Sequence, residues 1–209
     1  MMTKSAILKD PRQTRSWDAL ERAFVFLSHS HVLADVTVTQ LARCAQISRP
    51  TFYQHARDVR DLAAKVALAR LSAATPVLPG IGSAQEGSGD AISDTLARTI
   101  AAPLTHLAEN RRFYKSVLEF AGSPDLYARI VDLLLDRMDS GLFSDAARTS
   151  GVSPIEVAKV VHGGLMWRIV GWLIDGIDET PPQDLASEIG KIFSALVERP
   201  AIGKCSGNP

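Results

Sequence analysis

Hydrophobic residues recur at helical spacing along nearly the whole chain. Near the amino terminus, Trp17, Leu20 and Phe24 lie three or four residues apart, which places them on one face of a helix. Runs in which polar and apolar residues alternate, as they do in a strand, are scarce. The pattern therefore predicts an all-α protein of about nine helices.

Start signals divide the N-terminal third into short helices. Thr37 followed by Gln40 has the spacing of a capping box and predicts the start of a second helix. Ser48 can cap a third helix, with Pro50 in its first turn, where the missing N–H costs nothing. An Asp-x-x-Asp sequence repeats the signal before a fourth helix over about residues 58–74.

The clearest break in the pattern is the segment 75–90, which is rich in Gly, Pro and Ser and predicts a loop. Five more helices are expected beyond it, and Pro103 is expected to kink or split the first of them. Ser153 and Thr180, each followed by Pro, signal the starts of the last two helices. The first of these two is apolar nearly all round, as expected of a helix buried on both sides.

Composition and charge add a division of the chain. With 209 residues, 46% of them hydrophobic, the chain can form one large or two small domains. The net charge of zero argues against binding of a polyanion along the whole chain. Residues 1–75, however, hold 11 Lys and Arg against 6 Asp and Glu, and the remainder holds 12 against 17. This asymmetry predicts a basic N-terminal module joined to an acidic body.

The cysteines and the apolar segments point to a cytoplasmic protein. Cys44 and Cys205 form no disulfide framework, and Cys44, among Ala and Leu, is expected to be a small buried residue. We find no signal-peptide pattern and no uncharged apolar stretch of membrane-spanning length.

Motifs for catalysis or metal binding are not found. His29 and His31 stand two apart without a further pair of ligands, and no nucleophile elbow occurs. We therefore predict no catalytic residues, no metal and no cofactor, and we expect that the chain is not an enzyme.

The second and third predicted helices, with a short turn at residues 46–48 between them, have the layout of a helix-turn-helix. In that motif the second helix enters the major groove of DNA. Arg49 can pair with a guanine edge or hold a phosphate, whereas Phe52 is expected to face the core. Hydroxyl, imidazole and further Arg side chains nearby suit phosphate oxygens. The predicted DNA-binding residues are Thr37, Thr39, Gln40, Ser48, Arg49, Pro50, Thr51, Tyr53, Gln54, His55, Arg57 and Arg60.

Residues 37–62 resemble the DNA-binding signature of TetR-type transcriptional regulators, which runs Thr-Val-x-x-Ile-Ala-x-x-Ala-Gly-Val-Ser-x-x-Thr-Phe-Tyr-x-His-Phe-x-x-Lys-x-x-Leu. Three positions depart from it: Gln46 stands where the family has Gly, Ala56 where it has a large aromatic residue, and Val59 where it has Lys. Gln46 is expected to take a left-handed conformation at some cost. Arg57 or Arg60 is expected to replace the phosphate contact of the family's Lys.

The resemblance implies a helix-turn-helix domain over 1–60 and a larger ligand-binding and dimerisation domain over 61–209, with the fourth helix connecting them. The last two helices would form a four-helix bundle with those of a second copy. The implied dimer-interface residues are Gly164, Arg168, Gly171, Trp172, Leu185, Ile189, Phe193 and Leu196. The implied pocket residues for a small-molecule effector are Phe113, Tyr114, Leu118, Met138, Phe143, His162, Met166 and Trp167.

Arg168 lies within the apolar helix and needs a partner for its charge. An acid across the dimer would serve, and so would an anionic effector. The candidate acids are Asp132, Asp136 and Glu188.

Three hypotheses follow. The first is a homodimeric, ligand-responsive transcriptional repressor that binds a palindromic operator in double-stranded DNA. The second is a helical small-molecule carrier or enzyme without DNA binding. The third is a related protein that binds other proteins and no longer reads an operator.

Overall fold

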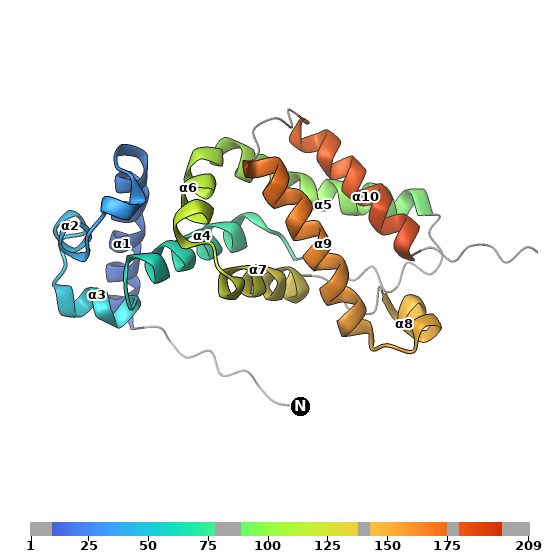
Figure 1. Ribbon diagram of the computed structural model, residues 1–209, viewed down its shortest axis with the longest axis horizontal. Helices are drawn as coiled ribbons and strands as arrows, with labels where there is room; N and C mark the ends of the chain where they lie inside the picture. Colours follow the sequence, from blue (N-terminus) through green and yellow to red (C-terminus); the bar gives the residue numbers. More distant parts are fainter. Residues whose placement is uncertain (1–9, 78–88, 138–142, 175–179, 198–209) are drawn as a thin grey trace, which may run out of the picture. The chain divides into compact units, whose positions relative to one another are not determined.

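The computed structural model describes residues 10–77, 89–137, 143–174 and 180–197, and within these ranges every regular element is a helix (Figure 1). The expectation of an all-α fold is thereby confirmed. The elements are α1 (Pro11–Ser30), a 3-10 turn (Leu33–Asp35), α2 (Val38–Cys44), α3 (Arg49–His55), α4 (Val59–Ala74), α5 (Gly89–Glu109), α6 (Arg111–Ala121), α7 (Pro124–Arg137), α8 (Ser144–Ser150), α9 (Pro154–Ile174) and α10 (Pro182–Val197).

The start signals read from the sequence form as predicted. The Thr37 hydroxyl accepts from the Gln40 N–H at 3.2 Å, and the Gln40 side chain accepts from the Thr37 N–H at 2.8 Å, which completes the capping box of α2. The Ser48 hydroxyl accepts from the Thr51 N–H at 3.2 Å at the start of α3. Each cap satisfies a backbone donor that has no partner inside its helix.

Two elements differ from the prediction. Helix α5 is not split at Pro103, because Leu96, Leu104 and Leu107 are buried on both sides of it and hold one continuous helix in the core. Helix α8 was not predicted, since its seven residues are mostly small or polar and carry no helical period. Most of the predicted loop 75–90 lies outside the described residues, and α5 begins inside it at Gly89.

The chain divides into two compact units. The N-terminal unit holds α1, α2, α3, α4 as far as Arg70, and the segment Asn110–Leu126 with α6. The body unit holds the end of α4, α5, α7 from Tyr127, α8, α9 and α10. The domain limit predicted at residue 60 stays a prediction, because compactness alone does not define where a function resides.

The N-terminal unit has a small core to which each of its helices contributes. Phe24 of α1, Leu41 of α2, Phe52 of α3 and Leu62 of α4 are fully buried. Phe24 meets the edge of the Phe113 ring of α6 at a centroid distance of 6.2 Å. Full burial of such side chains contributes about 1.5–3 kcal/mol each, so the position of α3 depends chiefly on Phe52.

Cys44 is exposed, contrary to the expectation that it is buried. The buried side of α2 runs through Leu41 and Ala42, with Ala45 just beyond the helix, and Cys44 lies beside that strip. In a helix this short, a shift of one position moves a residue from the core to the solvent. The apolar neighbours of Cys44 in the sequence therefore do not predict whether it is buried.

In the body unit, α10 packs against α5 (Figure 1). The two helices approach closely at Gly190, where an added Cβ would lie 2.6 Å from the Ser93 carbonyl oxygen and 3.2 Å from the Ala97 Cβ. No rotamer change can relieve contact with a backbone oxygen. Gly190 therefore sets the distance between the two helices.

Helix α9 carries charged residues, so it does not contradict the expectation that no uncharged apolar stretch has membrane-spanning length. Within the described ranges it is the one helix that is long and apolar enough to cross a membrane by length and composition, with a mean hydropathy of 1.2 over its most apolar window. A third of that window is buried, and core helices of soluble proteins meet the same criterion. Helix α9 has three charged residues: Lys159 pairs with Glu156 of the same helix, and Arg168 pairs with Glu188 of α10.

We expect Gly190→Ala to lower the free energy of unfolding of the body unit by about 1–3 kcal/mol, because α5 must move away from α10. Gly163→Ala on α9 is the matched control, since its Cβ meets no atom within 4 Å. It should be neutral or stabilise by up to about 1 kcal/mol through helix propensity. Urea unfolding followed by circular dichroism measures both changes. Equal stability of the two variants would contradict the close approach.

Candidate nucleic-acid interface

The turn between α2 and α3 is built around Gln46. This residue has φ 55°, in the left-handed region, as predicted from its place where the TetR-type signature has Gly. The Ile47 N–H donates to the Ala42 carbonyl at 2.9 Å and the Gln46 N–H to the Arg43 carbonyl at 3.2 Å. These are the two hydrogen bonds of a Schellman turn, and they satisfy the last carbonyls of α2. The backbone therefore makes a tight helix-turn-helix without a glycine.

Helix α3 has one anchored face and one open face. Phe52 is fully buried and Ala56, directly after the helix, is nearly so. Arg49, Pro50, Tyr53 and Gln54 are exposed on the other face. Tyr53 keeps half of its surface open although its ring packs edge-on against Phe52, with centroids 5.4 Å apart. The open face offers a guanidinium, a phenol and an amide to a partner, which are groups that read base edges and phosphates.

Several of the predicted DNA-binding residues also hold the helix starts. Thr37 and Gln40 form the capping box of α2. The Ser48 and Thr51 hydroxyls bond to each other at 2.8 Å. Thr39 is exposed and takes no part in these caps. Their contacts with DNA stay predictions. The capping bonds alone account for hydroxyl and amide residues at the helix starts.

His55 lies against α1. Its Nε2 is 2.7 Å from the Ser16 hydroxyl, and its ring packs beside Trp17 at a centroid distance of 6.0 Å. Burial, and then the charge of Lys65, lower the pKa of His55. A neutral, hydrogen-bonded imidazole gives a phosphate little attraction, so the geometry favours a role for His55 in joining α3 to α1.

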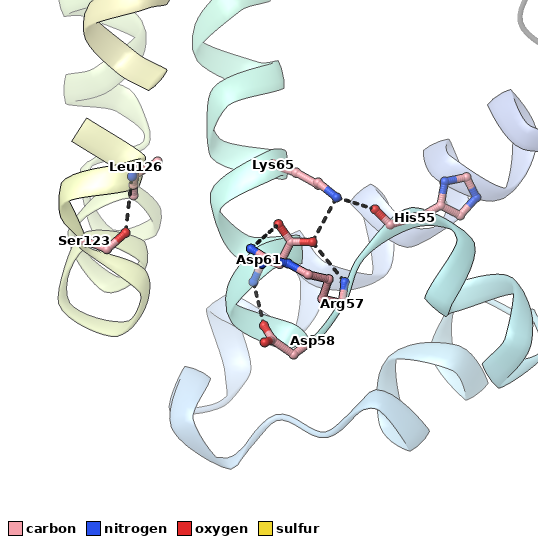
Figure 2. A network of polar contacts seen from close by, with 7 residues as sticks. All are labelled: His55, Arg57, Asp58, Asp61, Lys65, Ser123 and Leu126. Carbon is pink, nitrogen blue, oxygen red and sulfur yellow. Dashed lines mark hydrogen bonds and ion pairs between the residues drawn. The ribbon is translucent and has the colours of Figure 1, made fainter. Parts of the chain in front are cut away.

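A buried carboxylate joins the end of α3 to the start of α4 (Figure 2). Asp61 Oδ2 accepts from the Arg57 N–H at 2.9 Å and from Lys65 Nζ at 2.9 Å. Lys65 Nζ also donates to the His55 carbonyl oxygen at 2.8 Å, which is the last carbonyl of α3. The Asp58 side chain accepts from the Asp61 N–H at 2.8 Å and caps α4. We call Asp58, Asp61 and Lys65, with the backbone groups that they bind, the α3–α4 clamp.

The electrostatics of the α3–α4 clamp favour an ionised Asp61. Its side chain is 6% exposed. Burial alone would raise its pKa, but the Arg57 N–H and the Lys65 ammonium outweigh burial, and the pKa is lowered. A cation at the carboxyl end of α3 also matches the negative end of the helix dipole.

Arg57 and Arg60 differ in availability. The Arg57 side chain is 84% exposed and is only loosely paired with Asp61 at 3.8 Å, so it can meet a phosphate. The Arg60 guanidinium instead donates to the Phe120 carbonyl and lies over the Phe120 ring, 4.6 Å from its centroid. Of the two residues expected to replace the family's Lys, Arg57 has the geometry for it.

Sequence reasoning did not select Arg43, which is exposed in the last turn of α2, or Arg12 and Arg15, which are exposed in the first turns of α1. These cations lie on the same unit as the open face of α3. The signal in the sequence was the positive balance of residues 1–75, which cannot separate a phosphate contact from a solvated Arg.

The predicted effector-pocket residues fall into both units. Phe113, Tyr114 and Leu118 are on α6 in the N-terminal unit. Burial raises the pKa of Tyr114 to about 12, so its phenol stays neutral. Met138 lies outside the described residues.

In the body unit, Phe143 and His162 are buried and pack with Phe193, the two phenylalanine centroids lying 6.1 and 5.9 Å from the imidazole. The His162 Nδ1 bonds to the Ala158 carbonyl at 2.7 Å, and burial lowers its pKa. Met166 is buried as well, whereas Trp167 is exposed. The pocket assignment stays a prediction.

The predicted dimer-interface residues divide between the core and the surface of one chain. Within the described residues, those on the surface or partly exposed are Gly164, Arg168, Gly171 and Leu196. Those buried inside the single chain are Trp172, Leu185, Ile189 and Phe193. Arg168 pairs with Glu188 of the same chain at 3.1 Å, so one of the three predicted acids is its partner, but within the protomer.

Comparisons with known proteins show which solved structures share this fold. No protein-family model matches the chain, and no curated protein is significantly similar to it. The structure resembles the TetR family repressor AlkX from Dietzia sp. strain DQ12-45-1b, implicated in biodegradation of n-alkanes, with a TM-score of 0.57 and 17% identity over 90% of this chain and 96% of that one. It also resembles a TetR transcriptional regulator from Rhodococcus sp. RHA1, with a TM-score of 0.55 and 14% identity over 90% and 97% of the two chains. The dihydroxyacetone kinase operon activator DhaS gives 0.54 and 16% over 87% and 96%. The chain therefore has the fold of the TetR-type regulators, as the resemblance of residues 37–62 implied.

We expect Asp61→Asn to lower the free energy of unfolding by about 1–3 kcal/mol at pH 7, because it leaves the Lys65 ammonium without its anion. The lowered pKa of Asp61 means that its stabilising effect is present above the unfolded pKa near 3.9 and is lost as pH falls through the folded value. The difference between wild type and variant should therefore shrink below about pH 4. Urea titrations at pH 7 and pH 3.5 measure it. Asp18→Asn, at an exposed position of α1, is the control and should change little. A difference independent of pH would contradict the clamp.

Proposed function

We propose that the chain is a DNA-binding transcriptional regulator that acts as a homodimer. The observation that carries the proposal is the α2–turn–α3 motif, whose second helix is anchored by Phe52 and leaves Arg49, Tyr53 and Gln54 open. The motif stands in a fold shared with TetR-type regulators over about nine-tenths of the chain.

In the proposed mode of binding, α3 lies in the major groove and Arg49 contacts a guanine edge or a phosphate. Arg43 and Arg57 supply phosphate contacts on either side of it. The operator is a palindrome, since two copies related by twofold symmetry present two identical reading helices. A small molecule bound by the protein would change the arrangement of the two copies and so the affinity for DNA. We propose repression as the outcome of DNA binding, although the structural neighbours include an activator as well as a repressor.

Exposed apolar side chains on α9 and on α10 support the dimer. Val160 is 76% exposed and Trp167 61%, and Gly164 lies between them in sequence with open space where a Cβ would be. Ile192 and Leu196 of α10 are each 49% exposed. Large exposed side chains gathered on two helices favour a covering partner, and a glycine permits close approach of a second helix. A second copy of this chain is the occupant that we propose, which also explains why α9 is so apolar without crossing a membrane.

The proposal is tested by fluorescence anisotropy with DNA from upstream of the chain's own gene, over a salt series and against scrambled competitor. Specific binding that weakens with salt, at two protomers per site, supports a regulator. Absence of salt-dependent binding to that DNA and to a library of genomic fragments would favour a carrier or a protein-binding relative.

We expect Arg49→Ala to weaken specific binding by roughly 1–3 kcal/mol if Arg49 reads a base, with nonspecific binding much less affected. Arg98→Ala on α5 removes the same charge from an exposed position in the body unit and should leave DNA binding unchanged. The anisotropy titration above measures both variants. A uniform loss on all DNA would reduce Arg49 to a phosphate contact, and no loss would remove it from the interface.

We expect Trp167→Glu to shift the protein from dimer to monomer, because it places a charge in the centre of the proposed contact. Phe26→Glu is the matched control, since Phe26 is 65% exposed but lies on α1 in the N-terminal unit. Sedimentation velocity over a range of concentrations measures the change. A dimer that survives Trp167→Glu and fails with Phe26→Glu would place the interface on α1 instead.

A further inference from the structure

The N-terminal unit has a groove that plays no part in the proposed function. It lies between the end of α1 with the following 3-10 turn, Arg60 at the start of α4, and one face of α6. Its volume is about 530 Å³, within the range of sites for small molecules. All of its lining residues belong to the same compact unit, so the groove is complete without the body unit.

The charges that line the groove favour an anion. Arg60 and Arg112 supply two guanidinium groups against one carboxylate, that of Glu119. Glu119 is itself 4.0 Å from Lys115, which reduces its effect. Within the described part of the chain, the Arg112 side chain makes no hydrogen bond or ion pair, and Ser116, one turn along α6, offers a hydroxyl that makes none either. A guanidinium with a hydroxyl one turn away matches the two oxygens of a carboxylate.

Apolar side chains line one part of the groove, and Ser28, Ser30 and His31 line another. Val32 is 69% exposed in the apolar part. The Phe120 ring lies under the Arg60 guanidinium, and Arg60 is held in place by the Phe120 carbonyl. The Arg60 charge is therefore fixed next to an aromatic wall, so that a ligand with both an anionic and an apolar part gains from both.

We propose that this groove binds a small organic carboxylate. The carboxylate pairs with Arg112 and Ser116, with Arg60 adding its field, and the apolar body lies against Val32 and Phe120. Binding of this ligand goes beyond the proposed function and does not depend on it.

One consequence does rest on the proposed function. The 3-10 turn of the groove leads directly into α2, and α6 contacts that turn. A ligand between them joins α6 to the entrance of the helix-turn-helix. Its presence is therefore expected to change the affinity for the operator.

The test uses the full chain and isothermal titration calorimetry with sodium octanoate, with inorganic phosphate as a second probe. Octanoate is expected to bind at one site per chain and more tightly than phosphate, which lacks an apolar part. Arg112→Gln should weaken octanoate binding about tenfold or more, since hydrogen-bonded charge pairs contribute at that level. Glu119→Gln removes the anion from the groove and should tighten binding.

Arg12→Gln is the matched control, because it removes one positive charge from an exposed residue of the same unit that does not line the groove. Equal weakening by Arg112→Gln and Arg12→Gln would mean a general charge effect and overturn the site. Absence of octanoate binding to the wild type, or phosphate binding as tightly as octanoate, would overturn the class of ligand. Circular dichroism of each variant confirms that it is folded.

The regulatory consequence is read separately, as the DNA affinity of wild type and Arg112→Gln with and without octanoate. A change in wild type that is lost in Arg112→Gln supports it. Octanoate binding together with a total lack of DNA binding would retain the site and remove the proposed function.

Discussion

The geometry of the N-terminal unit depends on one ammonium group. Lys65 bonds the Asp61 carboxylate and, on its other side, the last carbonyl of α3 at His55. A short helix of seven residues has little stability of its own, so its direction comes from its attachments. The buried Phe52 ring holds α3 against the core of the N-terminal unit, and Lys65 holds the carboxyl end of α3. The open face that we assign to DNA points where it does because both attachments hold.

Local features were predictable from the sequence, and tertiary ones were not. Thr37, Ser48 and Gln46 act within a few residues of themselves, and their caps and turn formed as expected. The direction of a long or titratable side chain depends on segments far along the chain. Arg60 turned to Phe120, sixty residues away, and His55 to Ser16, thirty-nine residues away. No local pattern contains those neighbours, so their partners had to come from the structure.

The two sides of helix α9 differ in how far they are buried. Trp172 is buried and its indole N–H donates to the Thr180 carbonyl at 2.9 Å, whereas Trp167 of the same helix is mostly exposed. The sequence predicted an apolar helix, with Trp172 at the dimer interface and Trp167 in the effector pocket. The structure separates an inward side, which completes the body unit, from an outward side next to the Tyr127 ring of α7, 5.6 Å away. One apolar helix thus has an inward side that is buried in the body unit and an outward side on which Trp167 is largely exposed.

The turn at Gln46 has a consequence for how such proteins are recognised. A left-handed conformation costs a non-glycine residue about 1 kcal/mol, a small part of the stability of a folded domain. The two Schellman hydrogen bonds and the packing on either side retain the turn against that cost. The turn between α2 and α3 therefore keeps its backbone shape without a glycine. A sequence pattern that requires glycine here passes over chains whose backbone follows the same path, and three-dimensional comparison recovers them.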